Sequence, residues 1–195
     1  MKLKRNFFNR NTLLVAKELL GKSLCRKING KTVKVRITET EAYCGTKDLA
    51  CHASKGLTPR TKIMFGSPGH AYVYMIYGMY HCLNFVTEKE GNPSAVLIRK
   101  AELMNKELRI MNNDKNPKNH NSKFIIHNSI LNGPGKLCRE LKIDKKLNSV
   151  DVCKSRELWV EDSGIKVNLN KIKKGKRIGV DYAEKWKEKM WRFWI

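Results

Sequence analysis

The chain has 195 residues, with 40 Lys and Arg against 18 Asp and Glu, which gives a formal net charge of +22 at pH 7. Its composition of 41% hydrophobic and 30% charged residues excludes a wholly disordered protein. No apolar run approaches the roughly 20 residues that a membrane-spanning helix needs, and no apolar stretch follows the basic N-terminus as in a secretory signal. A soluble protein of the reducing cell interior is therefore expected.

The excess of positive charge predicts a polyanionic partner, with nucleic acid first and an anionic membrane second. The alternative is a compositional bias, since Lys, Asn and Ile are abundant throughout the sequence. Charge does not distinguish DNA from RNA.

The elements expected in chain order begin with a helix over residues 11–20 that ends at Gly21. Two strands, 23–27 and 32–43, follow and are joined through Asn29-Gly30, a strong hairpin turn. The later expected elements are strands at 70–77, 81–86 and 94–100, a helix at 101–111, a mobile loop at 112–123, a helix from Gly133-Pro134 through Leu141, and a helix beginning at Asp181 and Glu184 with Tyr182, Trp186 and Met190 on one stripe.

Neither an internal repeat nor a Pro-, Gly- or Ser-rich linker divides the chain, so a single domain over residues 1–195 is expected. Strands outnumber helices and the hairpin signals are antiparallel. The predicted class is α+β, a mixed α/β domain with a curved, mainly antiparallel sheet flanked by helices.

Six cysteines are scattered along the chain without any Cys-x-x-Cys pair. The nearest approach to a cluster is Cys44 with Cys51 and His52, and its spacing is wrong for structural zinc. Buried free thiols are expected, with no metal and no cofactor.

The strand at residues 33–43 carries the most informative pattern. Strict alternation puts Glu39, Glu41 and Tyr43 on the same face as the apolar residues that precede them. A buried carboxylate is costly unless something offsets the loss of hydration, so a functional acid is one interpretation. The alternatives are a strand that emerges into solvent, or an arginine paired with each acid. Arg99 points inward by its own strand register and is expected to meet a carboxylate.

Tyrosines dominate residues 71–80. Tyr72 and Tyr74 share a face, and Tyr77 sits beside Gly78 at an expected hairpin turn, where an exposed ring could act as a wedge into stacked bases. The alternative is a core position. Asn84 is a poor strand residue in an apolar setting and needs hydrogen-bond partners. A lone histidine such as His52 is more often structural than catalytic.

Residues 58–61 predict a turn with a basic tip, either ordinary surface or a phosphate contact. Gly133-Pro134-Gly135 superficially resembles the turn of helix-hairpin-helix repair proteins, and a short Gly-rich turn before a helix is weak evidence of anion binding.

Together these residues form an ordered pattern that resembles the alkyladenine (3-methyladenine, methylpurine) DNA glycosylases, from about Phe7 to the C-terminus. The motifs that carry the resemblance are Ile37-Thr38-Glu39-Thr40-Glu41-Ala42-Tyr43, Asp48-x-Ala50-x-His52, Thr58-Pro59-Arg60, Tyr72-Val73-Tyr74-x-Ile76-Tyr77-Gly78, Cys82-x-Asn84, Val96-Leu97-x-Arg99 and Gly133-Pro134-x-Lys136-Leu137-Cys138.

The resemblance implies roles for seven residues. Glu41 matches the carboxylate that activates water, and Arg99 matches the arginine that helps to hold this water. Three residues match those that sandwich and hydrogen-bond a flipped base: Tyr43, His52 and Tyr74. Asn84 matches the pocket residue that opposes the amino group of guanine, and Tyr77 matches the tyrosine that fills the vacated stack. The resemblance gives Glu39 no catalytic role, and His81 stands where an aromatic residue is usual.

What the resemblance implies is a monofunctional, metal-free purine DNA glycosylase of base excision repair. Its expected partner is double-stranded DNA containing damaged purines, with no membrane partner, and it is expected to work as a monomer with the DNA inside the cell, in a bacterial cytoplasm or nucleoid. The rival interpretation is a non-enzymatic basic nucleic-acid-binding module. A buried Glu41 facing an aromatic pocket distinguishes the two, because a binding module needs no such acid.

Overall fold

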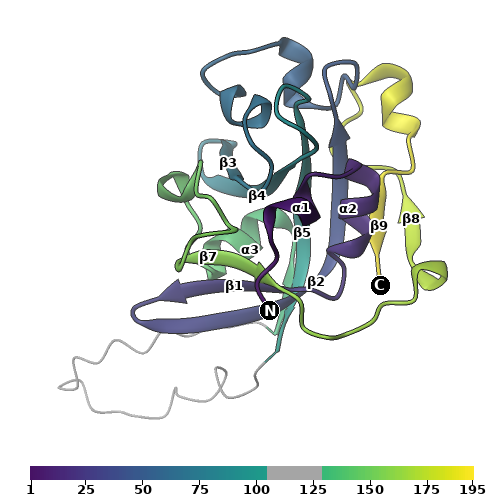
Figure 1. The fold of residues 1–195 in the computed structure, drawn as a ribbon. Coiled ribbons are helices and arrows are strands. Elements are labelled where there is room, and N and C mark those ends of the chain that lie inside the picture. The colour runs from purple at the N-terminus through teal and green to yellow at the C-terminus, as the bar shows by residue number, and fades with distance from the viewer. Residues whose placement is uncertain (105–128) are drawn as a thin grey trace.

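A computed structural model of the chain describes residues 1–104 and 129–195. Within these residues three α-helices and nine strands form an α+β fold, as predicted, with one mainly antiparallel sheet (Figure 1). The helices are α1 (Arg5–Phe8), α2 (Thr12–Glu18) and α3 (Pro134–Glu140). The strands are β1 (Ser23–Ile28), β2 (Lys31–Cys44), β3 (Ala71–Ile76), β4 (Tyr80–Thr87), β5 (Ser94–Leu103), β6 (Ile130–Asn132), β7 (Leu158–Glu161), β8 (Lys173–Gly175) and β9 (Arg192–Trp194).

The long strand β2 organises the sheet, because β1, β5 and β9 all pair with it. The strand order is β3-β4-β5-β2-β1-β7, with β6 added to β5 and with β8 paired to β9. The predicted hairpin turn at Asn29-Gly30 is confirmed, and both residues have the positive φ (48° and 77°) that a tight turn of this type requires. The β1–β2 hairpin thus follows from local pattern and turn chemistry together.

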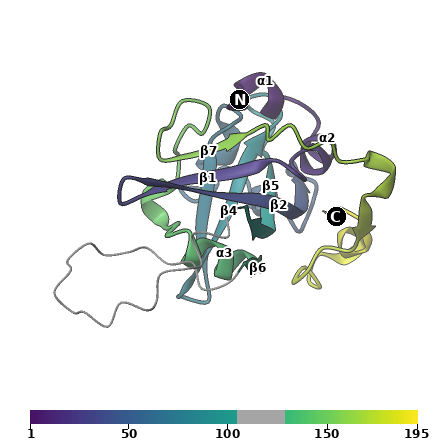
Figure 2. The same cartoon turned by 90° about the horizontal axis from the view of Figure 1, so that it is seen from below.

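The helices pack on the strands through short apolar stripes. Asn11 caps α2, since its Oδ1 accepts hydrogen bonds from the backbone N–H groups of Leu13 and Leu14, and Val15 and Ala16 are fully buried. The predicted helix after Gly133 is α3, with Pro134 in its first turn. Figure 2 shows α1 and α2 on one side of the strands and α3 on the other. None of the helices in the described residues is long and apolar enough to cross a bilayer.

Two helix predictions are corrected by the structure. β5 continues through Leu103, where a helix was expected from residue 101, because Ala101 pairs with Ile37 on one side and with Leu131 on the other. Pairing on both edges overrides the helical propensity of this stretch. Residues 105–111 of that helix and the loop predicted at 112–123 lie outside the described residues.

The predicted C-terminal helix is also wrong. Only a 3-10 turn forms, at Glu184–Glu188, and no side chain caps it. Tyr182 and Met190 are 67% and 43% exposed, and of the apolar stripe that suggested a helix only Trp186 packs against a small core cluster, formed by Ala50, Val180 and Ala183. Tyr182, at the start of this segment, instead lines a cavity.

Candidate active site

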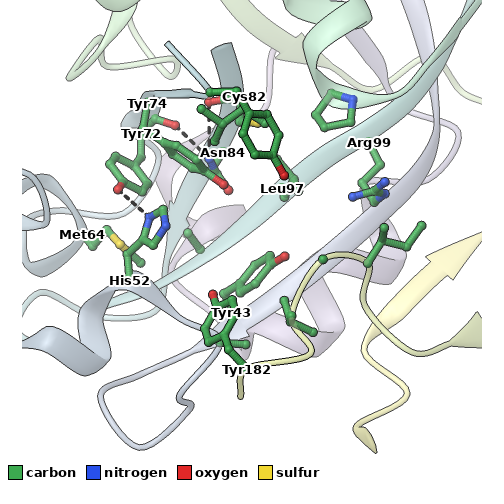
Figure 3. A pocket seen from close by; sticks show the side chains of 18 residues that line it. Tyr43, His52, Met64, Tyr72, Tyr74, Cys82, Asn84, Leu97, Arg99 and Tyr182 are labelled. Carbon is green, nitrogen blue, oxygen red and sulfur yellow. Dashed lines mark hydrogen bonds between the residues drawn. The ribbon is translucent and has the colours of Figure 1, made fainter. Parts of the chain in front are cut away.

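A cavity of about 330 Å³ lies between the sheet and the C-terminal segment. Six of the seven predicted site residues line it: Tyr43, His52, Tyr74, Tyr77, Asn84 and Arg99. In Figure 3, Tyr43 lies across the cavity from His52, Tyr72 and Tyr74. The seventh residue, Glu41, has no exposed surface and lies behind Tyr43 and Arg99, both of which contact it. The structure therefore brings the predicted residues together, with the acid behind the wall of the cavity.

The end of β2 supplies the acid. A register shift against β5 between Ile37 and Thr40 forms a β-bulge, so strict alternation holds only on either side of it. Glu39 lies in the bulge, and Arg99 contacts its carboxylate as well as that of Glu41, while Tyr43 also contacts Glu41, so the three share a side, as predicted. Since Glu41 is fully buried, the alternative in which the strand emerges into solvent there is excluded. The other alternative, an arginine paired with each acid, does occur, because Arg99 contacts both Glu39 and Glu41 beside the cavity.

Glu41 is held by three donors. Its Oε2 accepts a hydrogen bond from the Tyr43 hydroxyl at 2.7 Å, its Oε1 accepts one from the backbone N–H of Ile178 at 2.9 Å, and Arg99 Nη1 lies 3.4 Å from Oε1. Burial nevertheless raises the pKa of the Glu41 carboxyl above its ordinary value, against the opposing effects of Arg99, the tyrosine hydroxyl and the backbone amide. Glu41 is thus a fully buried carboxylate of increased basicity, separated from the cavity by Tyr43 and Arg99.

The opposite wall is aromatic and uncharged. His52 Nδ1 is 2.8 Å from the Tyr72 hydroxyl, and the His52 ring meets Tyr74 edge-on with centroids 4.5 Å apart. Burial and the nearby Arg60 guanidinium lower the pKa of His52 to about 4, so its ring is neutral at pH 7. Arg60 lies 5.1 Å from the Tyr74 ring centre. The basic tip predicted at 58–61 therefore packs on the cavity wall.

Asn84 on β4 is buried and has the partners that the sequence required. Its side-chain amide donates to the backbone carbonyl of Tyr72 at 3.0 Å and approaches that of Cys82 at 3.5 Å. Both contacts fix the amide group against the strand. In the cavity wall, Asn84 is therefore held in one orientation and resists displacement by a ligand.

Tyr77 occupies the tip of the β3–β4 hairpin. It is 86% exposed, which excludes a core position, and it has a positive φ of 51° beside Gly78 at 69°. A non-glycine residue with positive φ is uncommon, and two in succession form the tight turn that holds the ring away from the sheet. Tyr77 is thus a projecting aromatic side chain at the mouth of the cavity.

His81 does not line this cavity. It pairs with Met75 across the hairpin and faces a separate hollow formed with α3 and the residues after it. His81, which stands where the resemblance has an aromatic residue, is therefore not in contact with a ligand bound in this cavity.

Arg177, which no sequence pattern indicated, is 4% exposed and joins the C-terminal segment to the rest of the site. Its guanidinium forms two hydrogen bonds with the fully buried Asp48 (2.6 and 2.8 Å) and donates to the Ala42 carbonyl at 2.9 Å. It also lies 4.8 Å from the Tyr43 ring centre. One arginine among 40 basic residues gives no sequence signal of burial, although Asp48 belongs to a recognised motif.

The six cysteines, all in the described residues, are free thiols as expected, and four of them are buried. Burial is the main cause that raises their pKa values, to about 12 for Cys51 and above the ordinary value for Cys82 in the cavity wall. Among the described residues, no three His, Cys, Asp or Glu side chains are grouped so that they could hold a metal ion.

Comparison with known proteins identifies the family. The family model described as methylpurine-DNA glycosylase (MPG) matches residues 6–195. The chain belongs to the methylpurine-DNA glycosylase family. A protein of Methanocella arvoryzae named "Putative 3-methyladenine DNA glycosylase" is 52% identical over 98% of this chain and 91% of its own length. Proteins of the same name from Desulfitobacterium hafniense and Alkaliphilus oremlandii are 47% and 48% identical over the whole chain and over 95% and 96% of their lengths.

Membership confirms the resemblance seen in the sequence. This methylpurine-DNA glycosylase is an enzyme that acts on DNA, a hydrolase of N-glycosyl bonds. Behind the wall of its cavity lies a carboxylate of raised pKa with a cation beside it, and the facing wall is aromatic.

The pair of Asp48 and Arg177 should dominate the stability of this glycosylase. Asp48→Asn leaves the buried Arg177 charge without its partner, which costs about 3–5 kcal/mol of unfolding free energy. Glu102→Gln is the matched control, because Glu102 pairs with Arg36 at 2.5 Å with both side chains about one third exposed, and it should cost less than about 1 kcal/mol. Urea unfolding of both variants measures the difference. Equal losses would show that the buried pair contributes no more than a surface one.

Proposed function

We propose that this glycosylase flips an alkylated or deaminated purine out of double-stranded DNA and hydrolyses its N-glycosidic bond, leaving an abasic site. The proposed substrates are of the 3-methyladenine, 7-methylguanine, hypoxanthine and ethenoadenine class. The enzyme would act as a monomer, as a single domain over residues 1–195, without metal or cofactor, in the bacterial cytoplasm or nucleoid. The observation that carries this proposal is the buried, basic Glu41 directly behind an aromatic cavity.

The rival function is a basic module that binds nucleic acid without chemistry. Such a module would gain nothing from Glu41, since a buried carboxylate costs stability and repels phosphate. Charge and exposed aromatic residues fit both functions, whereas the acid fits only the enzyme. The family membership favours the enzyme as well.

The reaction follows from the contacts of Glu41. Each carboxylate oxygen has two acceptor positions, so a water that enters between Tyr43 and Arg99 can still donate to it. Water oxygen attacks C1′ while its proton passes to Glu41, and the electrons of the C1′–N bond leave with the base. The sugar gains oxocarbenium character in the transition state, and the anionic carboxylate stabilises that positive charge.

Lesion selectivity would come from the aromatic wall and from leaving-group chemistry. A purine such as 3-methyladenine carries a positive charge, is attracted to aromatic faces and leaves as a neutral base. His52 is neutral at pH 7 and adds no positive charge to this wall, so the nearby cation that opposes such a lesion is Arg60, 5.1 Å from the Tyr74 ring centre. A neutral lesion such as hypoxanthine leaves less readily and needs a proton from an acid or from water.

Extrusion of the base loses a few kcal/mol of stacking, which protein contacts have to offset. The exposed Tyr77 ring at the hairpin tip is placed to fill the vacated space. The net charge of +22 provides phosphate attraction along the duplex. Binding energy gained outside the cavity would thus be used to present the lesion to Glu41.

The decisive test is Glu41→Gln, which keeps the shape of the side chain and removes the base. Lesion binding should be retained, and single-turnover base release from a 3-methyladenine duplex should be lost. In the parent enzyme release should fall as the pH drops through the raised pKa of Glu41, because only the ionised carboxylate accepts a proton. Release by Glu41→Gln at the parental rate would overturn the proposed function. Glu102→Gln again serves as the control, since Glu102 lies outside the cavity.

Tyr77→Ala should lower the flipped population and weaken lesion binding by about 1–3 kcal/mol, the value of one base–aromatic stack. Tyr77→Asn is the matched variant, because asparagine tolerates the positive φ at this turn and also lacks the ring. The melting temperature should barely change in either variant, since the side chain is exposed. Fluorescence of a 2-aminopurine beside the lesion reports flipping. An unchanged signal in both variants would rule out Tyr77 as the wedge.

Asn84→Ser should increase release of purines that carry a 2-amino group. The amide of Asn84, held by its bond to the Tyr72 carbonyl, would clash with that group, whereas the smaller serine leaves room for it and can still accept a hydrogen bond. Guanine release from mismatched pairs should rise while 3-methyladenine release changes little. Guanine release equal to that of the parent would place the discrimination in another residue or in the flipping step.

A further inference from the structure

Glu39 is a second carboxylate beside the site, on the β2 bulge, with a side chain only 13% exposed. It does not line the cavity, so it does not contact a ligand bound there. Its Oε1 lies 3.3 Å from Arg99 Nε and 3.3 Å from Arg192 Nη1. One carboxylate oxygen thus faces two arginines from two different strands, β5 and β9.

The first arginine is shared between the two acids. Arg99 Nη1 lies 3.4 Å from Glu41, and Arg99 Nε lies 3.3 Å from Glu39. This Nε is buried and makes no hydrogen bond of good geometry with the described residues, so the ionic contact with Glu39 is what compensates its burial. Contacts at two points of the guanidinium fix its rotation, which fixes where its positive charge lies relative to Glu41.

The second arginine links Glu39 to the other side of Glu41. Arg192 Nε donates to the Lys176 carbonyl at 2.9 Å, and its guanidinium lies 4.6 Å from the Trp194 ring centre. Two residues after Lys176, the backbone N–H of Ile178 donates to Glu41. Glu39 therefore contacts both a cation that faces Glu41 and a side chain that holds the segment with the backbone donor to Glu41.

Resting on the function proposed for Glu41, we propose that Glu39 is a positioning residue that holds Arg99 and the 176–178 segment in place against Glu41. It also balances charge, since two carboxylates face Arg99 and Arg192. The remaining charged or titratable groups near Glu41 are Tyr43 on β2, Arg177 in the C-terminal segment and Cys82 on β4. With Glu39 neutral, Arg99 would be balanced by Glu41 alone, which would stabilise the ionised Glu41 and make it a weaker base.

The test is Glu39→Gln, measured as single-turnover release of 3-methyladenine from a duplex between pH 5 and 9, beside Glu102→Gln as the control. Release should fall roughly tenfold, a part of the ~10²–10⁴-fold that a general base contributes. The acid limb of the pH profile should move to lower pH, because Glu41 loses its proton more readily. Lesion affinity should stay at the parental value. A merely structural residue would not move the pH limb.

A parental rate and an unmoved acid limb in Glu39→Gln, as in Glu102→Gln, would overturn the inference. If Glu39→Gln does not fold, Arg192→Gln replaces it, because Arg192 is a quarter exposed and belongs to the second link alone. This variant should slow release with lesion binding retained, and a parental rate would overturn the inference. Base release by Glu41→Gln at the parental rate would contradict the proposed function itself. An inactive Glu41→Gln together with a fully active Glu39→Gln would contradict only the role of Glu39.

Discussion

The site depends on one buried ion pair, between Asp48 and Arg177, in which both side chains are completely excluded from solvent. Neither charge is stable there without the other. Asp48 also accepts hydrogen bonds from the backbone of Cys44 and Ala50, and so shapes the turn between β2 and His52. Arg177 lies against Tyr43 and places the next backbone N–H on Glu41. This one ion pair therefore helps to position both the Tyr43 ring and the backbone N–H that binds Glu41.

The cavity consequently has two walls of different origin. The sheet supplies one wall, in which Asn84 and Arg99 come from the neighbouring strands β4 and β5, which pair from Asn84 with Leu97 to Thr87 with Ser94. The other wall is the C-terminal segment at 178–182, which has little regular structure of its own. Its two ends are tied to the sheet by the β8–β9 and β9–β2 ladders, and Arg177 and Ile178 add contacts with Asp48 and Glu41. A complete cavity therefore forms only when the last part of the chain has docked, which couples the folding of this segment to activity.

The sequence predicted the parts of this arrangement that are local. The Asn29-Gly30 hairpin and the strands around Gly78 follow from turn chemistry and β-propensity, and the site residues follow from their ordered motifs. Three features could not be predicted because they depend on distant partners. Ala101 is a strand residue because two other strands pair with it on either side. Arg177 is buried because it pairs with Asp48, which lies 129 positions earlier in the chain. The bulge at Glu39 has no signature in the alternating pattern.

Glu41 shows why such distant contacts are needed. A carboxylate with no donors in this buried place would take up a proton and lose its use as a base, whereas one with many strong donors would be a stable anion and a poor base. The site lies between these limits: one phenol, one backbone amide and one arginine at 3.4 Å oppose burial without cancelling it. Of these three groups, Arg99 is the one that Glu41 shares with another acid, because Glu39 contacts the same guanidinium. The basicity of Glu41 is therefore a property of the whole network, and the adjacent carboxylate is part of what sets it.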